Sequence, residues 1–134
     1  MQCLDVACHD LGGRGPTLLM LHANGFHGRT FLPMLPTLAP HFHCLALDLP
    51  GHGDAPAPEG PFYAEDLLAA VRRFVEERGL LGCYCLGHSL GGVMAALLQL
   101  ERPGTFKWVG PWRGLERPGI AEWVGSVQWG DDGA

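Results

Sequence analysis

The segment Gly87-His88-Ser89-Leu90-Gly91-Gly92 constrains the fold of this 134-residue chain more than any other feature. It contains the pattern G-x-S-x-G, follows a short apolar run at 82–86 and opens an apolar helical pattern at 90–101. A serine in this context is typical of a nucleophile elbow, a strained strand-to-helix turn that projects the hydroxyl above a sheet. Small neighbours are needed because the backbone turns so sharply. The alternative is an ordinary glycine-rich turn that caps a helix.

Apolar runs and helical patterns alternate along the chain up to residue 106. Four runs have the character of buried strands, the first of them weakly: 4–8, 17–22, 43–48 and 82–86. Three segments are helical in pattern: 30–38, which two prolines weaken, 63–78 and 90–101. Gly79 is placed to end the second of these helices. Alternation of this kind predicts an α/β fold with a mostly parallel sheet and flanking helices.

The loop after the 17–22 strand reads His22-Ala23-Asn24-Gly25. A loop at the carboxyl end of a neighbouring strand can supply a backbone N–H to an oxyanion hole. We predict that the N–H groups of Asn24 and Leu90 are the two donors, and that the ring of His22 is structural. The alternative is a simple connection between a strand and a helix.

The loop at 48–55 follows the next predicted strand and contains two glycines. We expect a tight turn in which Asp48 caps local backbone groups. A phosphate-binding role is disfavoured, because the glycine spacing matches neither G-x-x-x-x-G-K-[ST] nor G-x-G-x-x-G.

These three segments, in this order, resemble motifs of the α/β-hydrolase superfamily in its lipase- and esterase-like branch. The segment 87–92 is similar to the elbow G-x-S-x-G-G. The segment 22–25 is similar to the oxyanion His-Gly motif, with Ala23 in place of glycine. The segment 48–55 is similar to the turn D-x-x-G-x-G-x-S, with Ala55 in place of serine. The resemblance covers about 17–105.

The resemblance implies a nucleophilic serine hydrolase that acts on an ester-like bond of a small-molecule substrate. It assigns the roles as follows: Ser89 as nucleophile, the N–H groups of Asn24 and Leu90 as oxyanion hole, and Gly87, Gly91 and Gly92 as elbow glycines. A serine rather than an aspartate at the elbow points away from haloalkane dehalogenase and epoxide hydrolase chemistry.

The general base has no candidate at its expected position. In the family, an acid and then a histidine follow the nucleophile in sequence. All seven histidines of this chain precede Ser89: His9, His22, His27, His41, His43, His52 and His88. Acidic residues do follow it: Glu101, Glu116, Glu122, Asp131 and Asp132. We therefore expect a catalytically incomplete chain. The alternative is a non-catalytic fragment that binds a ligand or a protein partner.

The composition changes at residue 107, and all four tryptophans follow it. We predict that 1–106 form the N-terminal part of a truncated α/β-hydrolase domain. We predict that 107–134 form an irregular tail rich in Trp and Gly, either out of frame or alternatively spliced. The 82–86 strand would then be an exposed sheet edge through which the chain could self-associate.

Composition excludes several other classes of protein. A net charge of −5 argues against a nucleic-acid partner. No apolar run approaches the roughly 18 residues of a membrane span, and no signal peptide is recognisable. Five cysteines without a C-x-x-C predict reduced, mostly buried thiols and a cytoplasmic protein. We expect no cofactor and no metal: a cluster of His41, His43 and His52 is disfavoured, and Cys83 and Cys85 are assigned to the core.

Overall fold

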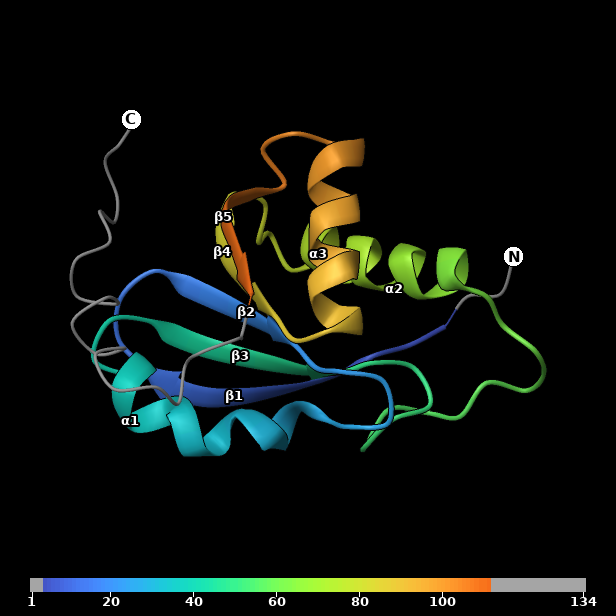
Figure 1. Cartoon of the computed structure of the whole chain (residues 1–134), viewed down its shortest axis with the longest axis horizontal. Coiled ribbons are helices and arrows are strands. Elements are labelled where there is room, and N and C mark those ends of the chain that lie inside the picture. The colour runs from blue at the N-terminus through green and yellow to red at the C-terminus, as the bar shows by residue number, and fades with distance from the viewer. Residues whose placement is uncertain (1–3, 112–134) are drawn as a thin grey trace.

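The computed structural model describes residues 4–111, which form a five-stranded sheet with helices on both faces (Figure 1). In chain order the elements are β1 (Ala7–Gly13), β2 (Thr17–Leu21), the 3₁₀ helix η1 (Gly28–Met34), α1 (Leu35–Leu38), β3 (His43–Asp48), α2 (Ala64–Glu77), β4 (Cys83–Gly87), α3 (Leu90–Glu101) and β5 (Phe106–Pro111). Among these residues, no helix combines the length and the apolar character that a bilayer span requires.

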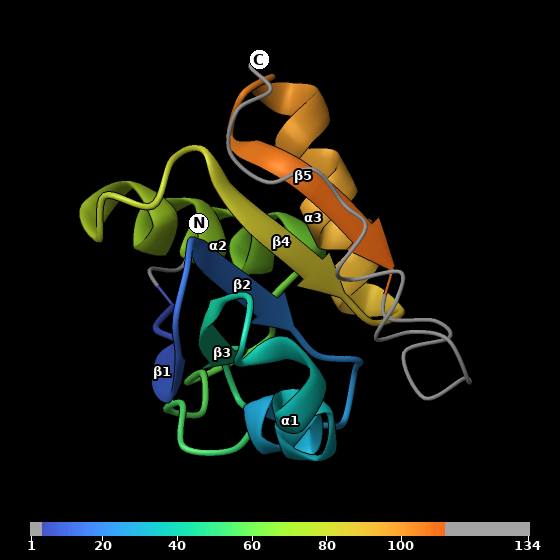
Figure 2. The same cartoon turned by 90° about the vertical axis from the view of Figure 1, so that its left-hand side faces the viewer.

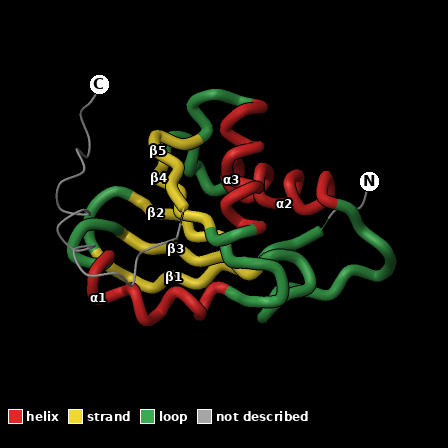
Figure 3. Tube along the Cα trace, viewed as in Figure 1, coloured by secondary structure: helices red, strands yellow, loops and turns green. Residues whose placement is uncertain are grey.

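The strand order is β1-β3-β2-β4-β5. Only β1 runs antiparallel to its neighbour, and the pairs β3–β2, β2–β4 and β4–β5 are parallel. The predicted α/β fold with a mostly parallel sheet is therefore confirmed. Because parallel strands all end at the same edge of a sheet, the loops that follow β2, β3 and β4 emerge together (Figure 3).

Two apolar layers bury the central strands from both sides. Leu19 and Leu21 of β2 belong to the layer shared with α2 and α3. Leu18 and Met20 belong to the layer shared with η1 and α1. A strand covered on both faces reads as a continuous apolar run, which is how this strand could be recognised from sequence.

Helix α2 is capped at both ends by residues that adjoin or belong to it. Asp66 accepts a hydrogen bond from the N–H of Tyr63 at 2.8 Å. At the other end Gly79 has φ +66°, and the N–H of Leu80 donates to the carbonyl of Val75. This is a Schellman arrangement, and it confirms that Gly79 ends the helix.

The predicted helix at 30–38 is split into two short pieces. Pro33 lies inside η1, and Pro36 occupies the first turn of α1. Because neither proline has an N–H to donate within a longer α-helix, the segment forms two short helices instead of one. Together these two helices still cover one face of the sheet.

Strand β5 corrects two expectations about the C-terminal part. Residues 107–111 continue a strand that pairs with β4 from Cys83↔Phe106 to Gly87↔Pro111, so the tail does not begin at 107 (Figure 2). The 82–86 strand is consequently not an exposed edge. Within the described residues the two edges of the sheet are β1 and β5. The rest of the predicted tail, 112–134, lies outside the described residues.

Candidate active site

The turn between β4 and α3 has the strained backbone that the sequence predicted. Ser89 has φ 55° and ψ −112°, and no other non-glycine residue between 4 and 111 has a positive φ. Such a conformation costs about 1–3 kcal/mol and persists only where the surroundings enforce it. Ser89 is exposed and stands at the start of α3, and its side chain makes no capping hydrogen bond there.

Two glycines near this serine, Gly87 and Gly91, leave no room for a side chain, and a third, Gly92, leaves little. A Cβ on Gly87 would lie 2.5 Å from Cα of Gly92. A Cβ on Gly91 would lie 2.2 Å from the carbonyl oxygen of Leu21. At Gly92 the nearest atom would be the Gly87 oxygen, at 3.2 Å. The first turn of α3 therefore rests directly on the ends of β4 and β2.

The loop after β2 lies beside this turn. Leu21 pairs with Gly87 across the sheet, and the N–H of His88 donates to the carbonyl of Leu21 at 2.9 Å. The rings of Phe26 and His88 meet edge to face, with centroids 5.9 Å apart. The segments that contain the two predicted oxyanion donors therefore begin side by side.

The predicted donors themselves are Asn24 and Leu90. Asn24 is exposed in the loop after β2. Leu90 is the first residue of α3, a position whose N–H has no partner inside its own helix.

His22 is completely buried, and both of its ring nitrogens are hydrogen-bonded. Nδ1–H donates to the carbonyl of Ala23 at 2.7 Å, and Nε2 accepts the N–H of Leu49 at 2.9 Å. Burial lowers the pKa of His22 below its ordinary value of 6.5, because a charged ring there would lose its water; the carbonyl of Ala23 opposes this shift. His22 is structural, as predicted.

Asp48 ties three segments together from the end of β3. Its carboxylate accepts hydrogen bonds from the N–H of Gly28 at 2.7 Å, the N–H of Asp54 at 2.8 Å and Nε2 of His9 at 2.7 Å. Burial alone would raise the pKa of Asp48, but these three donors hold it below its ordinary value. Gly53 has φ +51°, and a Cβ there would lie 2.3 Å from the carboxylate. The predicted capping role of Asp48 is confirmed.

His52 contributes to this region in a way that the sequence analysis missed. Its Nε2 accepts the N–H of Gly25 at 3.0 Å, and its Nδ1–H donates to the carbonyl of Pro50 at 3.0 Å. Its ring lies 4.9 Å from that of His22. The sequence did contain a signal for this contact: His22 and His52 closely follow the ends of β2 and β3, which are adjacent and parallel.

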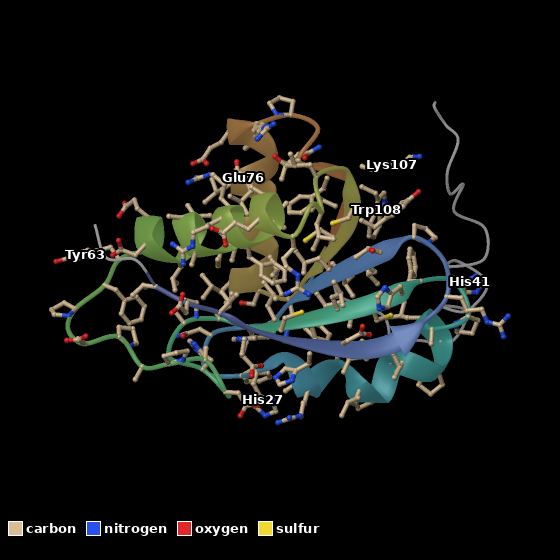
Figure 4. All side chains as sticks on the ribbon, turned by 180° about the vertical axis from the view of Figure 1, so that it is seen from behind. His27, His41, Tyr63, Glu76, Lys107 and Trp108 are labelled. Carbon is tan, nitrogen blue, oxygen red and sulfur yellow. The ribbon has the colours of Figure 1, made fainter. Side chains whose placement is uncertain are left out.

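The histidines do not form the metal cluster considered from sequence. His43 begins β3 and pairs with Asp10 at 2.8 Å, whereas His52 follows the opposite end of the same strand. Figure 4 shows His41 and His27 at opposite ends of the sheet.

A different set, His9, Asp48 and Asp54, has ligand atoms within 4.8 Å of one another. Backbone and His9 donors already engage Asp48, and Arg29 lies 3.4 Å from Asp54. These groups form an ion-pair network.

The described cysteines are free thiols, and three of the four are buried: Cys44, Cys83 and Cys85. Burial raises the pKa of Cys83 to about 12 and that of Cys44 to about 11. The assignment of Cys83 and Cys85 to the core is confirmed, because both belong to the apolar layer under α2 and α3. Protonated thiols of this kind are poor nucleophiles and poor metal ligands.

Comparison with known proteins identifies the fold. A model of the alpha/beta hydrolase fold family matches residues 16–107. The chain belongs to the alpha/beta hydrolase fold family. Its solved relatives include a putative ancestral haloalkane dehalogenase, with a TM-score of 0.74 and 26% identity over 83% of this chain and 40% of that one. A hydrolase from Pseudomonas aeruginosa PA01 has a TM-score of 0.71 and 28% identity over 78% of this chain and 40% of that one.

Two curated proteins are similar in sequence to part of this chain. A pimeloyl-[acyl-carrier protein] methyl ester esterase of Aeromonas salmonicida is 37% identical over 91 residues, or 68% of this chain and 35% of that protein. The dihydrolipoyllysine-residue acetyltransferase component of the acetoin cleaving system of Cupriavidus necator is 38% identical over 93 residues, or 69% of this chain and 25% of that protein. The matched region spans about a third or less of these relatives.

Proposed function

We propose that Ser89 is the nucleophile of an ester hydrolase site. The observation that carries the proposal is the backbone of Ser89, which has a positive φ at a strand-to-helix turn where Gly87 and Gly91 leave no space for a side chain. Strain of this kind is retained where it serves to present a reactive group. An ordinary helix cap would have extended backbone and would direct its hydroxyl to the helix N–H groups.

The chemistry of serine selects a carboxylic ester over an alkyl halide. Attack of Ser89 Oγ on an ester carbonyl forms an acyl-enzyme as the alcohol leaves with a proton, and water then releases the acid and restores the hydroxyl. Displacement of a halide by serine would give an alkyl ether, which water does not cleave. Esters are also the substrate class in the name of the pimeloyl-[acyl-carrier protein] methyl ester esterase relative.

The negative charge of the tetrahedral intermediate needs preorganised donors. We assign these to the N–H groups of Asn24 and Leu90. The position of Leu90 supports this role, because the positive end of the α3 dipole favours an anion there. The position of Asn24, three residues after the strand residue that pairs with Gly87, supports the second role.

We further propose that this chain by itself turns over slowly. No histidine follows Ser89 in the sequence, and the rings of His22 and His52 have both nitrogens engaged. A serine hydroxyl without a base is a poor nucleophile near neutral pH. Loss of the Ser–His unit costs on the order of 10⁶ in kcat in a serine protease.

Covalent labelling tests the nucleophile directly. The purified chain would be treated with a fluorophosphonate, with and without imidazole as an external base, and analysed by intact mass and peptide mapping. The chain has two serines, Ser89 and Ser126, so Ser126→Ala is a matched control for Ser89→Ala. We expect one adduct on Ser89, faster with imidazole, absent from Ser89→Ala and retained in Ser126→Ala.

The urea-unfolded chain gives the reference rate. The folded chain should react at least about tenfold faster than the unfolded one, because one oxyanion donor is worth roughly 10²–10³ in rate. Equal rates in the two states would contradict an activated site and favour a non-catalytic binding fragment. Robust turnover of p-nitrophenyl acetate that vanishes in Ser89→Ala would show that the chain does contain a base.

A further inference from the structure

Two histidines bind the loops after β2 and β3 to each other in a reciprocal manner. His22 lies in the first loop, and its Nε2 accepts the N–H of Leu49 from the second. His52 lies in the second loop, and its Nε2 accepts the N–H of Gly25 from the first. In both rings the Nδ1–H donates to a carbonyl of its own loop, that of Ala23 or that of Pro50. The rings contact each other at 4.9 Å, tilted by 52°.

This arrangement requires both rings to be neutral. A neutral imidazole has one donor nitrogen and one acceptor nitrogen, whereas an imidazolium has two donors and cannot accept. Each ring uses its single acceptor on a backbone N–H from the other loop. Protonation of either ring therefore removes one of the two bonds that join the loops.

We propose that His52, paired with His22, is a positioning residue that holds the oxyanion loop in its working position. The proposal rests on the role given above to the N–H of Asn24. Gly25, which His52 holds, is the next residue along the chain, so His52 constrains the peptide plane beside that donor. The loop is held at its other end by the bond from Gly28 to Asp48.

The same geometry gives His52 a second partner when it is protonated. Asn24 Oδ1 lies 3.4 Å from Nε2 of His52. In the neutral ring this nitrogen accepts from Gly25, and in the charged ring it can donate to Asn24 instead. Protonation would thus release the backbone of Gly25 and draw the side chain of Asn24 towards the ring.

Two titratable groups outside the pair act on the charge of His22. His27 in the loop after β2 opposes a charge on His22, whereas Asp48 at the end of β3 favours one. The ring of His52 also opposes a charge on His22, since the two centroids are 4.9 Å apart. The contact between the rings therefore favours the neutral state that both bonds require.

The test compares His52→Ala, which removes the acceptor, with His52→Gln, whose side-chain oxygen is a neutral acceptor that does not titrate. His41→Ala, at the far end of the sheet, is the control for loss of a histidine. Amide exchange at Gly25, read by NMR on the full chain, reports the bond itself. The fluorophosphonate rate at Ser89, measured from pH 8 to pH 5, reports its effect on the site.

We expect His52→Ala to lose protection at Gly25 and to label Ser89 about tenfold more slowly, a fraction of the effect of removing a donor. His52→Gln and His41→Ala should stay within about threefold of the wild-type rate on the same scale. The ratio of the wild-type rate to the His52→Gln rate should fall as pH falls, because protonation of His52 would release Gly25 whereas glutamine does not titrate. A ratio is used because it cancels the pH dependence of the reagent and of imidazole.

Two results would overturn the proposal. Equal protection of Gly25 in the wild type and in His52→Ala would show that the bond does not hold the loop. Lost protection with an unchanged labelling rate would show that His52 is structural and does not position the donor. If wild-type Ser89 takes no label, the proposed ester hydrolase function fails, and protection at Gly25 still decides whether His52 holds the loop.

Discussion

The elbow at 87–92 and the loop after β2 lie side by side but are held in place by different forces. At the elbow the backbone is fixed by exclusion, because the positions of Gly87 and Gly91 have no space for a side chain. The loop after β2 is fixed by hydrogen bonds that involve three side chains: its own His22, Asp48 at the end of β3 and His52 in the loop after β3.

This difference determines which of the two segments responds to a change in pH. The close backbone contacts of Gly87 and Gly91 do not involve any titratable group, so pH leaves them unchanged. The loop depends on two neutral imidazoles and one ionised carboxylate, whose states change with pH. Ser89 should therefore stay in place under conditions in which the neighbouring backbone of Asn24 moves.

The largest expected effect is Gly91→Ala. Its Cβ would lie 2.2 Å from a backbone oxygen of β2, and backbone in the centre of a sheet cannot shift without moving the strand. We expect a loss of about 3 kcal/mol or more in the free energy of unfolding, at the upper end of overpacking effects, measured by urea denaturation. Gly60→Ala is the control, because a Cβ there meets nothing within 4 Å. A Gly91→Ala variant as stable as Gly60→Ala would contradict steric control of the elbow.

The next largest effect should come from Asp48→Ala, which removes the acceptor that holds one end of the loop after β2. The change leaves the N–H groups of Gly28 and Asp54 without their acceptor in a buried site, where bonds to a charged group are worth about 1.5–3 kcal/mol each and are not fully additive. We expect a loss of roughly 2–3 kcal/mol in the free energy of unfolding. Asp10→Ala, which breaks an exposed pair with His43, should change the urea midpoint little. Similar midpoints for both variants would show that Asp48 does not anchor the loop.

Most of the fold could be predicted because its signals are local. The bounds of β3 and α3 were predicted to the residue, since apolar periodicity and flanking Pro or Gly define them. Strand β1 was predicted too early and too short: Gly12 and Gly13 have positive φ and sit at a bulge, so the segment does not look like a regular strand. Strand β5 was missed because Gly110 and Pro111 resemble a break, although Phe106 is buried at the end of the sheet.

The site was only partly predictable, for a physical reason. The elbow is a local motif whose characteristic residues lie within six positions, so its sequence is enough to find it. The contact between His22 and His52 depends on two loops that are distant in sequence and meet only because β2 and β3 pair in parallel. The missed network of His9 with Asp48 likewise depends on the antiparallel pairing of β1 with β3.

The pH dependence of the free energy of unfolding tests the hydrogen bonds of the loop separately from the packing of the elbow. Burial lowers the pKa of His22 in the folded chain, so the unfolded chain binds more protons as pH falls through 6.5. The free energy of unfolding should therefore be fully retained above 6.5 and should decrease below it. The lowered pKa of Asp48 adds a second loss below about 3.8.

Urea midpoints from pH 8 to pH 5 measure this loss, and NMR titration of the His22 ring assigns it. A ring that titrates at or above 6.5, or a midpoint that rises as the pH falls, would contradict the neutral buried state of His22.

The smallest effect is expected for Gly92→Ala, which tests whether steric control of the elbow is graded. Here the nearest atom to a new Cβ would be the Gly87 oxygen at 3.2 Å, a contact that a shift of a few tenths of an ångström relieves. Gly92 lies inside α3, where alanine gains about 1 kcal/mol over glycine in helix propensity. The two effects oppose each other, so the urea midpoint should correspond to a change within about 1 kcal/mol. A loss as large as that of Gly91→Ala would mean that the whole elbow is held as one rigid unit. A near-neutral result would place the steric limit at the two glycines that face backbone at less than 3 Å.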